Sequence, residues 1–395
     1  MLRSRRIFLS LYIAVFMSSL GLGILSPILP IYIDELAVSS TVLGIVFGAY
    51  SASRTLFMPP VGYLSDRWGR RGFIIGGLFL FTVVSPLYAI ADGVTQLILV
   101  RFLQGMAAAM LMPVAMSYIG DLAPEGKEGF LMGSFTSAFF AGLGFGPLIG
   151  GFLQDRYSVE AAFYGMGILS FVALVTTSLT LPSDSPSPGS VQSGWKRTGE
   201  KDRTVNMFHL TPNLSGLLFF RFTRALGIGF VWVLMPLYAV IELNISSFQV
   251  GILLSVNTFI TTFLQSPMGH LSDRIGHLKS ITFGSVAAAL AVAGISWTSG
   301  FGELIAVSVV LGTAGALIVP SGSALAVELG RTGGMGRVMG LYSTSLSLGT
   351  MAGPVLGGVI TDLYDIRLVF PIGGLLGLLG WATLIFSYSR NNTRA

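Results

Sequence analysis

One pattern of residues occurs twice in this chain, at a constant spacing of 207 positions. The segment 62–69 (GYLSDRWG) returns as 269–276 (GHLSDRIG), and 142–151 (GLGFGPLIGG) returns as 349–358 (GTMAGPVLGG). Pro113 returns as Pro320, and Glu35 returns as Glu242. Because one ungapped spacing links four separate landmarks, the chain is predicted to be two copies of one structural unit.

The composition places both copies in a membrane. The 395 residues are 52% hydrophobic and 10% charged, against about 25% charged in an ordinary soluble domain. A membrane-spanning helix needs about 20 apolar residues, and the first such run, after Arg6, is too long for a signal peptide and reads as a retained helix. The predicted spans, six in each copy, lie near residues 7–33, 41–63, 72–91, 95–120, 129–153, 161–181, 213–241, 247–269, 278–298, 302–327, 335–360 and 367–388.

The basic residues predict the orientation, because Lys and Arg gather in the cytoplasmic loops of membrane proteins. With twelve spans, 17 of the 23 Lys and Arg residues fall on one face, two fall on the other, and four lie inside helices. Both termini belong to the basic face, so we predict that they are cytoplasmic and that the protein lies in the cell (inner) membrane. The predicted domains are a six-helix bundle over 1–181, a Ser-, Pro- and Gly-rich cytoplasmic linker over 182–212, and a second bundle over 213–395.

The connection between the second and third spans combines glycines, an acid and arginines. Glycines at both ends of the segment 62–69 permit a tight turn and a close approach of another backbone. Asp66 can accept hydrogen bonds from the free N–H groups of a helix start, and the neighbouring arginines can pair with that carboxylate or with one at the end of the fourth span. Because the pattern recurs in the second copy, we interpret it as a gate. The predicted gate residues are Gly62, Asp66, Arg67, Gly69, Arg70, Asp121, Asp273 and Arg274.

The fifth span carries glycines four positions apart, with a proline among them. This spacing flattens one face of a helix, so that another helix can pack close to its backbone, and a proline permits a bend. Static packing explains the pattern in one copy, whereas its repetition in the eleventh span favours an interface that moves. The residues assigned to it are Gly142, Gly146, Pro147, Gly150, Gly353 and Pro354.

At these residues the chain resembles the major facilitator superfamily, and within it the twelve-helix drug:proton antiporters. The segment 62–71 resembles the gating loop of that superfamily, 101–105 (RFLQG) resembles a motif of its fourth helix, 142–151 resembles its antiporter motif, and 27–30 (PILP) resembles a proline pair of its first helix. The resemblance implies an all-α fold with twelve transmembrane helices in two pseudo-symmetric six-helix bundles. It also implies proton-coupled efflux and a role of Arg101 in proton transfer, but it implies no particular substrate.

The acids depart from the proton-antiporter pattern. All 18 lie at predicted helix ends or in loops, and none is placed at the bilayer centre. Proton coupling is therefore implied by the resemblance alone. Its candidates are Asp34 and Glu35 at the outer end of the first span, Asp66 and Asp121 at the cytoplasmic ends, and Arg101.

The charges predicted deep in the membrane are positive. An uncompensated charge there costs at least about 2.5–3.5 kcal/mol, so a deep arginine must face a cavity or a partner. Two interpretations of these arginines remain equally open. They form a site for an anionic or zwitterionic group, or they pair with backbone carbonyls or extend toward the membrane surface. A polar stripe along the eighth span fits a cavity wall or a helix–helix hydrogen-bond seam equally well. The substrate-binding candidates are Tyr50, Arg54, Gln104, Arg221, Arg224, Asn257 and Thr261.

These features predict a secondary active transporter, namely a proton-coupled exporter of small amphipathic or drug-like molecules that works by alternating access. The buried arginines keep an alternative open: a facilitator or proton-linked carrier of an organic anion or lipid-like solute. An enzyme is disfavoured because the predicted spans hold no His, no Cys and no paired acids. The expected partners are a small-molecule substrate, protons and the lipid bilayer, with no cofactor, metal or nucleic acid. The protein is predicted to function as a monomer.

Overall fold

The structure is a computed structural model that describes residues 2–35, 38–122, 128–181 and 211–392. These residues form helices and contain no strand. Twelve of the helices are long and apolar enough to cross a membrane, so the predicted all-α fold with twelve spans is confirmed. The elements are α1 (Leu2–Glu35), α2 (Ser40–Trp68), α3 (Arg70–Leu87), α4 (Val94–Leu122), α5 (Glu128–Arg156), α6 (Val159–Thr180), α7 (Pro212–Ile241), α8 (Ser247–Ile275), α9 (His277–Gly294), the 3-10 helix η1 (Ile295–Trp297), α10 (Phe301–Gly333), α11 (Met335–Leu363) and α12 (Ile366–Asn392).

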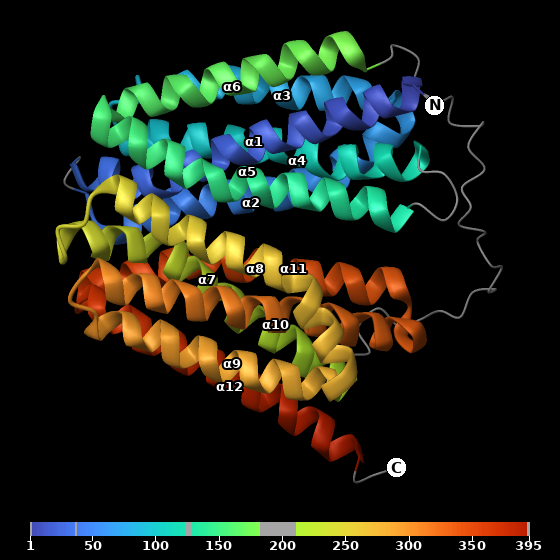
Figure 1. Ribbon diagram of the computed structural model, residues 1–395, viewed down its shortest axis with the longest axis vertical. Helices are drawn as coiled ribbons and strands as arrows, with labels where there is room; N and C mark the ends of the chain where they lie inside the picture. Colours follow the sequence, from blue (N-terminus) through green and yellow to red (C-terminus); the bar gives the residue numbers. More distant parts are fainter. Residues whose placement is uncertain (1, 36–37, 123–127, 182–210, 393–395) are drawn as a thin grey trace.

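The helices form two bundles that lie side by side along the long axis of the molecule, α1–α6 in one and α7–α12 in the other (Figure 1). In the first bundle α1 packs on α5 and α6, α2 on α4, and α3 on α4 and α6. The second bundle repeats each of these pairs six helices later. The bundles meet mainly through α2 with α11 and α5 with α8. Of the predicted linker 182–212, the part up to residue 210 lies outside the described residues.

Two glycines make the sharp turns of the repeated segment. Gly69 lies between α2 and α3 with φ 94°, and Gly276 lies between α8 and α9 with φ 99°, in a region that residues with a Cβ rarely adopt. Gly62 does not belong to the turn, because it lies inside α2, and a Cβ there would meet nothing within 4 Å. The prediction that Gly62 helps to form the turn is therefore wrong.

The glycines of the fifth and eleventh spans hold helices together within each bundle. A Cβ on Gly146 of α5 would lie 2.5 Å from the carbonyl oxygen of Leu20 in α1. A Cβ on Gly142 or Gly150 would overlap the α1 backbone in the same way, and a Cβ on Gly353 of α11 would overlap the backbone of α7. These glycines line the face that packs inside a bundle, where the missing Cβ lets two backbones touch. Pro147 and Pro354 of the same motif lie against the other bundle, at Gly251 of α8 and Gly44 of α2. Movement at this motif stays a prediction.

Gly146→Ala is expected to destabilise the protein, because the added methyl group overlaps the backbone of α1. Overpacking of this kind costs about 1–3 kcal/mol. Gly133→Ala in the same helix is the matched control, because a Cβ there would meet nothing within 4 Å and alanine is the better helix former. Thermal unfolding of both purified variants measures the difference. Equal melting temperatures for the two variants would contradict the packing described here.

Candidate transport pathway and gates

The two ends of the bundles differ in charge. One end holds the turns at Gly69 and Gly276 and both chain termini, and we call it the basic face. The other end carries Asp155, Glu160 and Asp362, and we call it the acidic face. The contacts between the bundles differ strongly from one face to the other.

Near the acidic face the bundles touch backbone to backbone. A Cβ on Gly151 of α5 would overlap the carbonyl oxygen of Ser247 in α8, and a Cβ on Gly358 of α11 would overlap that of Ser40 in α2. Gly44 of α2 approaches the α11 backbone just as closely. No side chain separates the helices at these points, so this end of the pathway is closed.

Two carboxylates reinforce this closure. Asp155, at the end of α5, accepts hydrogen bonds from the N–H groups of the first two residues of α8, at 3.2 and 2.9 Å. Asp362, at the end of α11, accepts them from the first two residues of α2, at 2.7 and 2.8 Å. Those N–H groups have no partner within their own helix, and a negative charge is stabilised at a helix N-terminus. We call these two caps, each joining one bundle to the other, the latch.

The latch acids were not among the predicted site residues, although the sequence holds their signal. Asp155 and Asp362 are related by the spacing of 207 positions, and so are Ser40 and Ser247, the first residues of the capped helices. The repeat therefore extends to both partners of each cap.

Toward the basic face the bundles separate. A Cβ would meet nothing within 4 Å at Gly62 of α2, Gly133 of α5 or Gly340 of α11. All three positions lie on helices that contact the other bundle near the acidic face. The structure is therefore closed at the acidic face and opens toward the basic face.

The predicted gate lies at the open face. Asp66, near the end of α2, forms an ion pair at 3.2 Å with Arg70, the first residue of α3 in the same bundle. Arg67, Asp273 and Arg274 are exposed. The side chain of the remaining predicted gate carboxylate, Asp121, lies outside the described part of the chain. Because Asp66 pairs locally here, it does not join the two bundles in this conformation.

A cavity lies at mid-depth, mostly within the second bundle. Its volume is about 240 Å³. Arg224 of α7 and the polar stripe of α8 (Asn257, Thr261 and Gln265) line it, together with apolar side chains such as Trp232. The structure thus brings together three of the predicted substrate-binding residues and adds Gln265.

Arg221 is turned away from this cavity. Its guanidinium lies 4.5 Å from the ring centre of Tyr342 in α11, which is the distance of a cation–π contact. In the first bundle, Tyr50 and Arg54 line a separate cavity of about 30 Å³. The predicted substrate-binding residues therefore do not form one site.

Arg101 and Gln104 belong to the core of the first bundle. Arg101 donates a hydrogen bond to Gln104 Oε1 at 3.0 Å, and its guanidinium lies 4.4 Å from the ring centre of Phe47. The Tyr88 hydroxyl donates to the same Gln104 oxygen at 2.8 Å. Gln104 is fully buried and lines neither cavity described above, so its prediction as a substrate ligand is corrected: it positions Arg101. Within the described residues Arg101 has no carboxylate partner.

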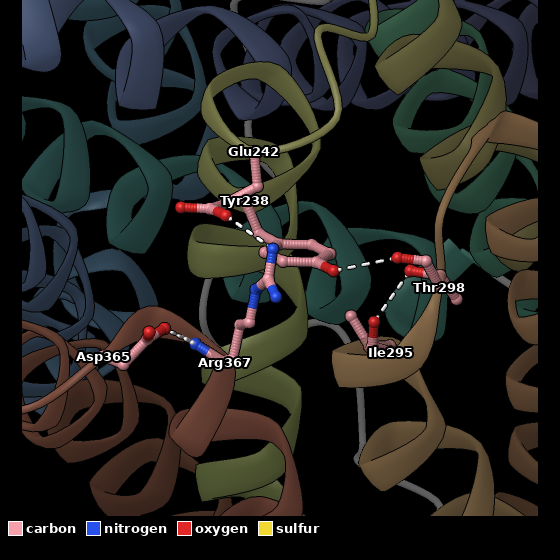
Figure 2. A network of polar contacts seen from close by, with 6 residues as sticks. All are labelled: Tyr238, Glu242, Ile295, Thr298, Asp365 and Arg367. Atoms are coloured by element: carbon pink, nitrogen blue, oxygen red, sulfur yellow. Dashed lines mark hydrogen bonds and ion pairs between the residues drawn. The ribbon is translucent and has the colours of Figure 1, made fainter.

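A polar cluster fixes the acidic-face end of the second bundle (Figure 2). The guanidinium of Arg367 in α12 forms an ion pair with Glu242 at 2.8 Å. The backbone N–H of Arg367 donates a hydrogen bond to Asp365 Oδ1 at 2.7 Å. The Tyr238 hydroxyl donates to the Thr298 carbonyl oxygen at 3.1 Å. The cluster joins α7, α12 and the segment after η1, so it stabilises one bundle and does not cross to the other.

The two predicted proton-coupling acids of α1 cannot be placed in the same detail. Asp34 and Glu35 are the last residues of α1. Their side chains lie outside the described part of the chain. Glu35 is the repeat partner of Glu242.

Asp155→Ala combined with Asp362→Ala is expected to shift the protein toward a state that opens at the acidic face. Each substitution removes a helix cap worth about 1 kcal/mol. The pair therefore lowers the equilibrium constant for the closed state about thirtyfold. The acidic-face distance between the bundles should lengthen in the double variant.

Spin labels on cysteines at Tyr157 and Trp297 measure that distance by double electron–electron resonance. Both positions are exposed at the acidic face, one in each bundle, and the sequence has no native Cys. Glu160→Ala is the matched control, because this acid lies at the same face and makes no hydrogen bond to the other bundle among the described residues. The same distance distribution in the double variant and the control would rule out the latch.

Comparison with known proteins gives a consistent family. The chain matches the Major Facilitator Superfamily over residues 11–215 and 217–394. It is 27% identical to the quinolone resistance protein NorA of Staphylococcus aureus, over 93% of this chain and 92% of that protein. It is 24% identical to multidrug resistance protein 2 of Bacillus subtilis, over 99% and 98%.

The fold has close counterparts among solved structures. A bacterial homolog of the human lysosomal transporter Spinster, solved in an inward-facing and occupied conformation, superimposes with a TM-score of 0.82. The alignment covers 97% of this chain and 96% of that one, at 14% sequence identity. Because the family match spans nearly the whole chain, this multi-pass membrane protein is a member of the major facilitator superfamily of transporters.

Proposed function

We propose that the protein is a secondary active exporter of small amphipathic molecules that works by alternating access and is driven by a proton gradient. One observation carries the proposal: a cavity with mostly apolar walls and a few polar groups lies between a closed face and an open face. Small-molecule sites are typically of this kind. Two relatives of similar length are named for drug resistance, which supports export of drug-like compounds.

The orientation follows from the basic residues. With the basic face in the cytoplasm of a cell (inner) membrane, the present conformation receives its solute from inside. The latch then closes the external side. Export requires the latch to break and the bundles to close at the basic face, where Asp66 and Asp273 lie.

Proton coupling is assigned to the acids of the acidic face. Asp34 and Glu35 remain candidates. Asp155 and Asp362 join them, because protonation removes the negative charge that each places at a helix N-terminus of the other bundle. Protonation would therefore weaken the latch and make the balance between the two conformations depend on the pH at this face.

A second function is favoured by the charge of the cavity. Its described lining includes Arg224 and no acid. This fits a facilitator or proton-linked carrier of an organic anion or lipid-like solute, as an alternative to a drug exporter.

Proteoliposomes with an imposed pH gradient test these functions, with a panel of cationic, neutral and anionic amphiphiles. Proton flux evoked by a transported compound supports the exporter. Solute movement without proton flux contradicts proton coupling and indicates a facilitator.

Gly315→Leu is expected to abolish transport, because a Cβ at Gly315 would lie 3.1 Å from Thr261 Oγ1 and a leucine would extend into the cavity. Gly302→Leu in the same helix is the control, since a Cβ there would meet nothing within 4 Å. Initial transport rates, normalised to the amount of reconstituted protein, compare the two. Full transport by Gly315→Leu would place the solute elsewhere.

A further inference from the structure

We propose that Arg224 binds an anionic group of the transported solute, so that the substrates are amphipathic anions. This inference rests on the proposed transport function and names the substrate class of the same cavity. Three features of the cavity carry it: an unpaired cation, space beside that cation, and an apolar wall.

The guanidinium of Arg224 lies deep in the membrane without a counter-charge. Arg224 lies about 18 Å along α7 from Pro212 and about 25 Å from Ile241. Its Nε is buried and has no hydrogen-bond partner, and no hydrogen bond or ion pair joins its side chain to any other described residue. A buried charge in this situation is costly unless a ligand completes it.

Two other deep arginines are accounted for by their own surroundings, and Arg54 lines the separate cavity of about 30 Å³. Arg101 is held by Gln104 and by the Phe47 ring, and Arg221 lies over Tyr342. The acids whose side chains are described lie at helix ends or in connections, away from the cavity. Arg224 is therefore the cation that faces the larger cavity and lacks a partner there.

The cavity has room for an anion beside this guanidinium. A Cβ on Gly315 of α10 would lie 3.7 Å from Arg224 Nη2, so the glycine keeps that space open. Gln265 lines the same cavity, and its amide has no hydrogen-bond partner among the described residues. The guanidinium and the amide N–H groups are both donors, which suits a carboxylate, sulfonate or phosphate group.

The rest of the wall suits an apolar body. Phe140 of α5, Trp232 of α7, and Ile318 and Val319 of α10 line the cavity. Burying apolar solute surface against these side chains is favourable. A cationic amphiphile would find the same apolar wall, but it would meet Arg224 and no acid in the described lining. The site therefore selects the sign of the charge.

Binding of three probes with one apolar body tests this proposal: naphthalene-2-sulfonate, 2-naphthylmethanol and 2-naphthylmethylammonium. The full chain is held in lipid nanodiscs, and isothermal titration calorimetry gives each dissociation constant. The sulfonate should bind about tenfold or more tightly than the alcohol, because it alone brings a negative charge and several acceptor oxygens to the guanidinium, whereas the alcohol offers one neutral hydroxyl. The ammonium probe should bind most weakly.

Arg224→Gln should weaken sulfonate binding about tenfold or more and change alcohol binding less than about twofold. Arg224→Lys keeps the charge and should retain the preference for the sulfonate. Arg331→Gln, at an exposed position near the end of α10, is the control. If Arg224→Gln does not fold, Gln265→Leu takes its place and should weaken the sulfonate more than the alcohol.

Two results would overturn the proposal: an equal loss of affinity for all three probes in a folded Arg224→Gln protein, or tighter binding of the ammonium probe than of the sulfonate. Proteoliposome uptake of the same probes separates this inference from the proposed function. Arg224-dependent sulfonate binding without uptake upholds the anion site and contradicts the transport function. Uptake of the sulfonate that is unaffected by Arg224→Gln upholds transport and contradicts the anion site.

Discussion

Backbone contact between helices of opposite bundles at the acidic face is the interaction on which the arrangement of the two halves depends. Gly151 and Gly358 remove the side chains that would hold the helices apart, and Asp155 and Asp362 then reach the N–H groups at the start of the facing helices. Helix caps are worth about 1 kcal/mol each. Two caps bias an equilibrium between conformations without locking it, which suits a protein whose two states must both be populated.

The strength of packing differs within and between the bundles, and this difference defines the moving parts. Inside each bundle, glycines such as Gly146 and Gly353 bring two helices into contact along several turns. Between the bundles, α2 with α11 and α5 with α8 touch near one face, and their glycines face open space near the other. A change of conformation that breaks the smaller set of contacts leaves each bundle intact. Under the proposed alternating access, the bundles would therefore move as rigid bodies about the cavity between the faces.

Hydropathy and the repeat were sufficient to predict twelve spans and two bundles, and the repeated glycines predicted the turns at Gly69 and Gly276. It was harder to predict which face of each helix packs inside its own bundle and which contacts the other bundle. A pattern that occurs in both copies shows that both copies use it, but Gly142 to Gly150 would repeat equally well inside a bundle or between bundles. Asp155 was missed because an acid at a helix end is ordinarily solvated. Its partners lie more than 90 positions away, and only the fold brings them together.

The two copies carry the same residues at the turns and at the latch, and they carry different residues around the cavities. The turn glycines, the latch acids and the capped serines all recur at the same spacing. By contrast, Tyr50 and Arg54 correspond to Asn257 and Thr261. The first pair lines a cavity of about 30 Å³ and the second pair one of about 240 Å³. Smaller side chains in the second copy leave room that the first copy fills with an aromatic ring and a guanidinium. Arg224 likewise corresponds to Met17 in the first copy. The symmetric positions therefore include the contacts that the proposed conformational change would break, and the asymmetric ones give the cavity its size and charge.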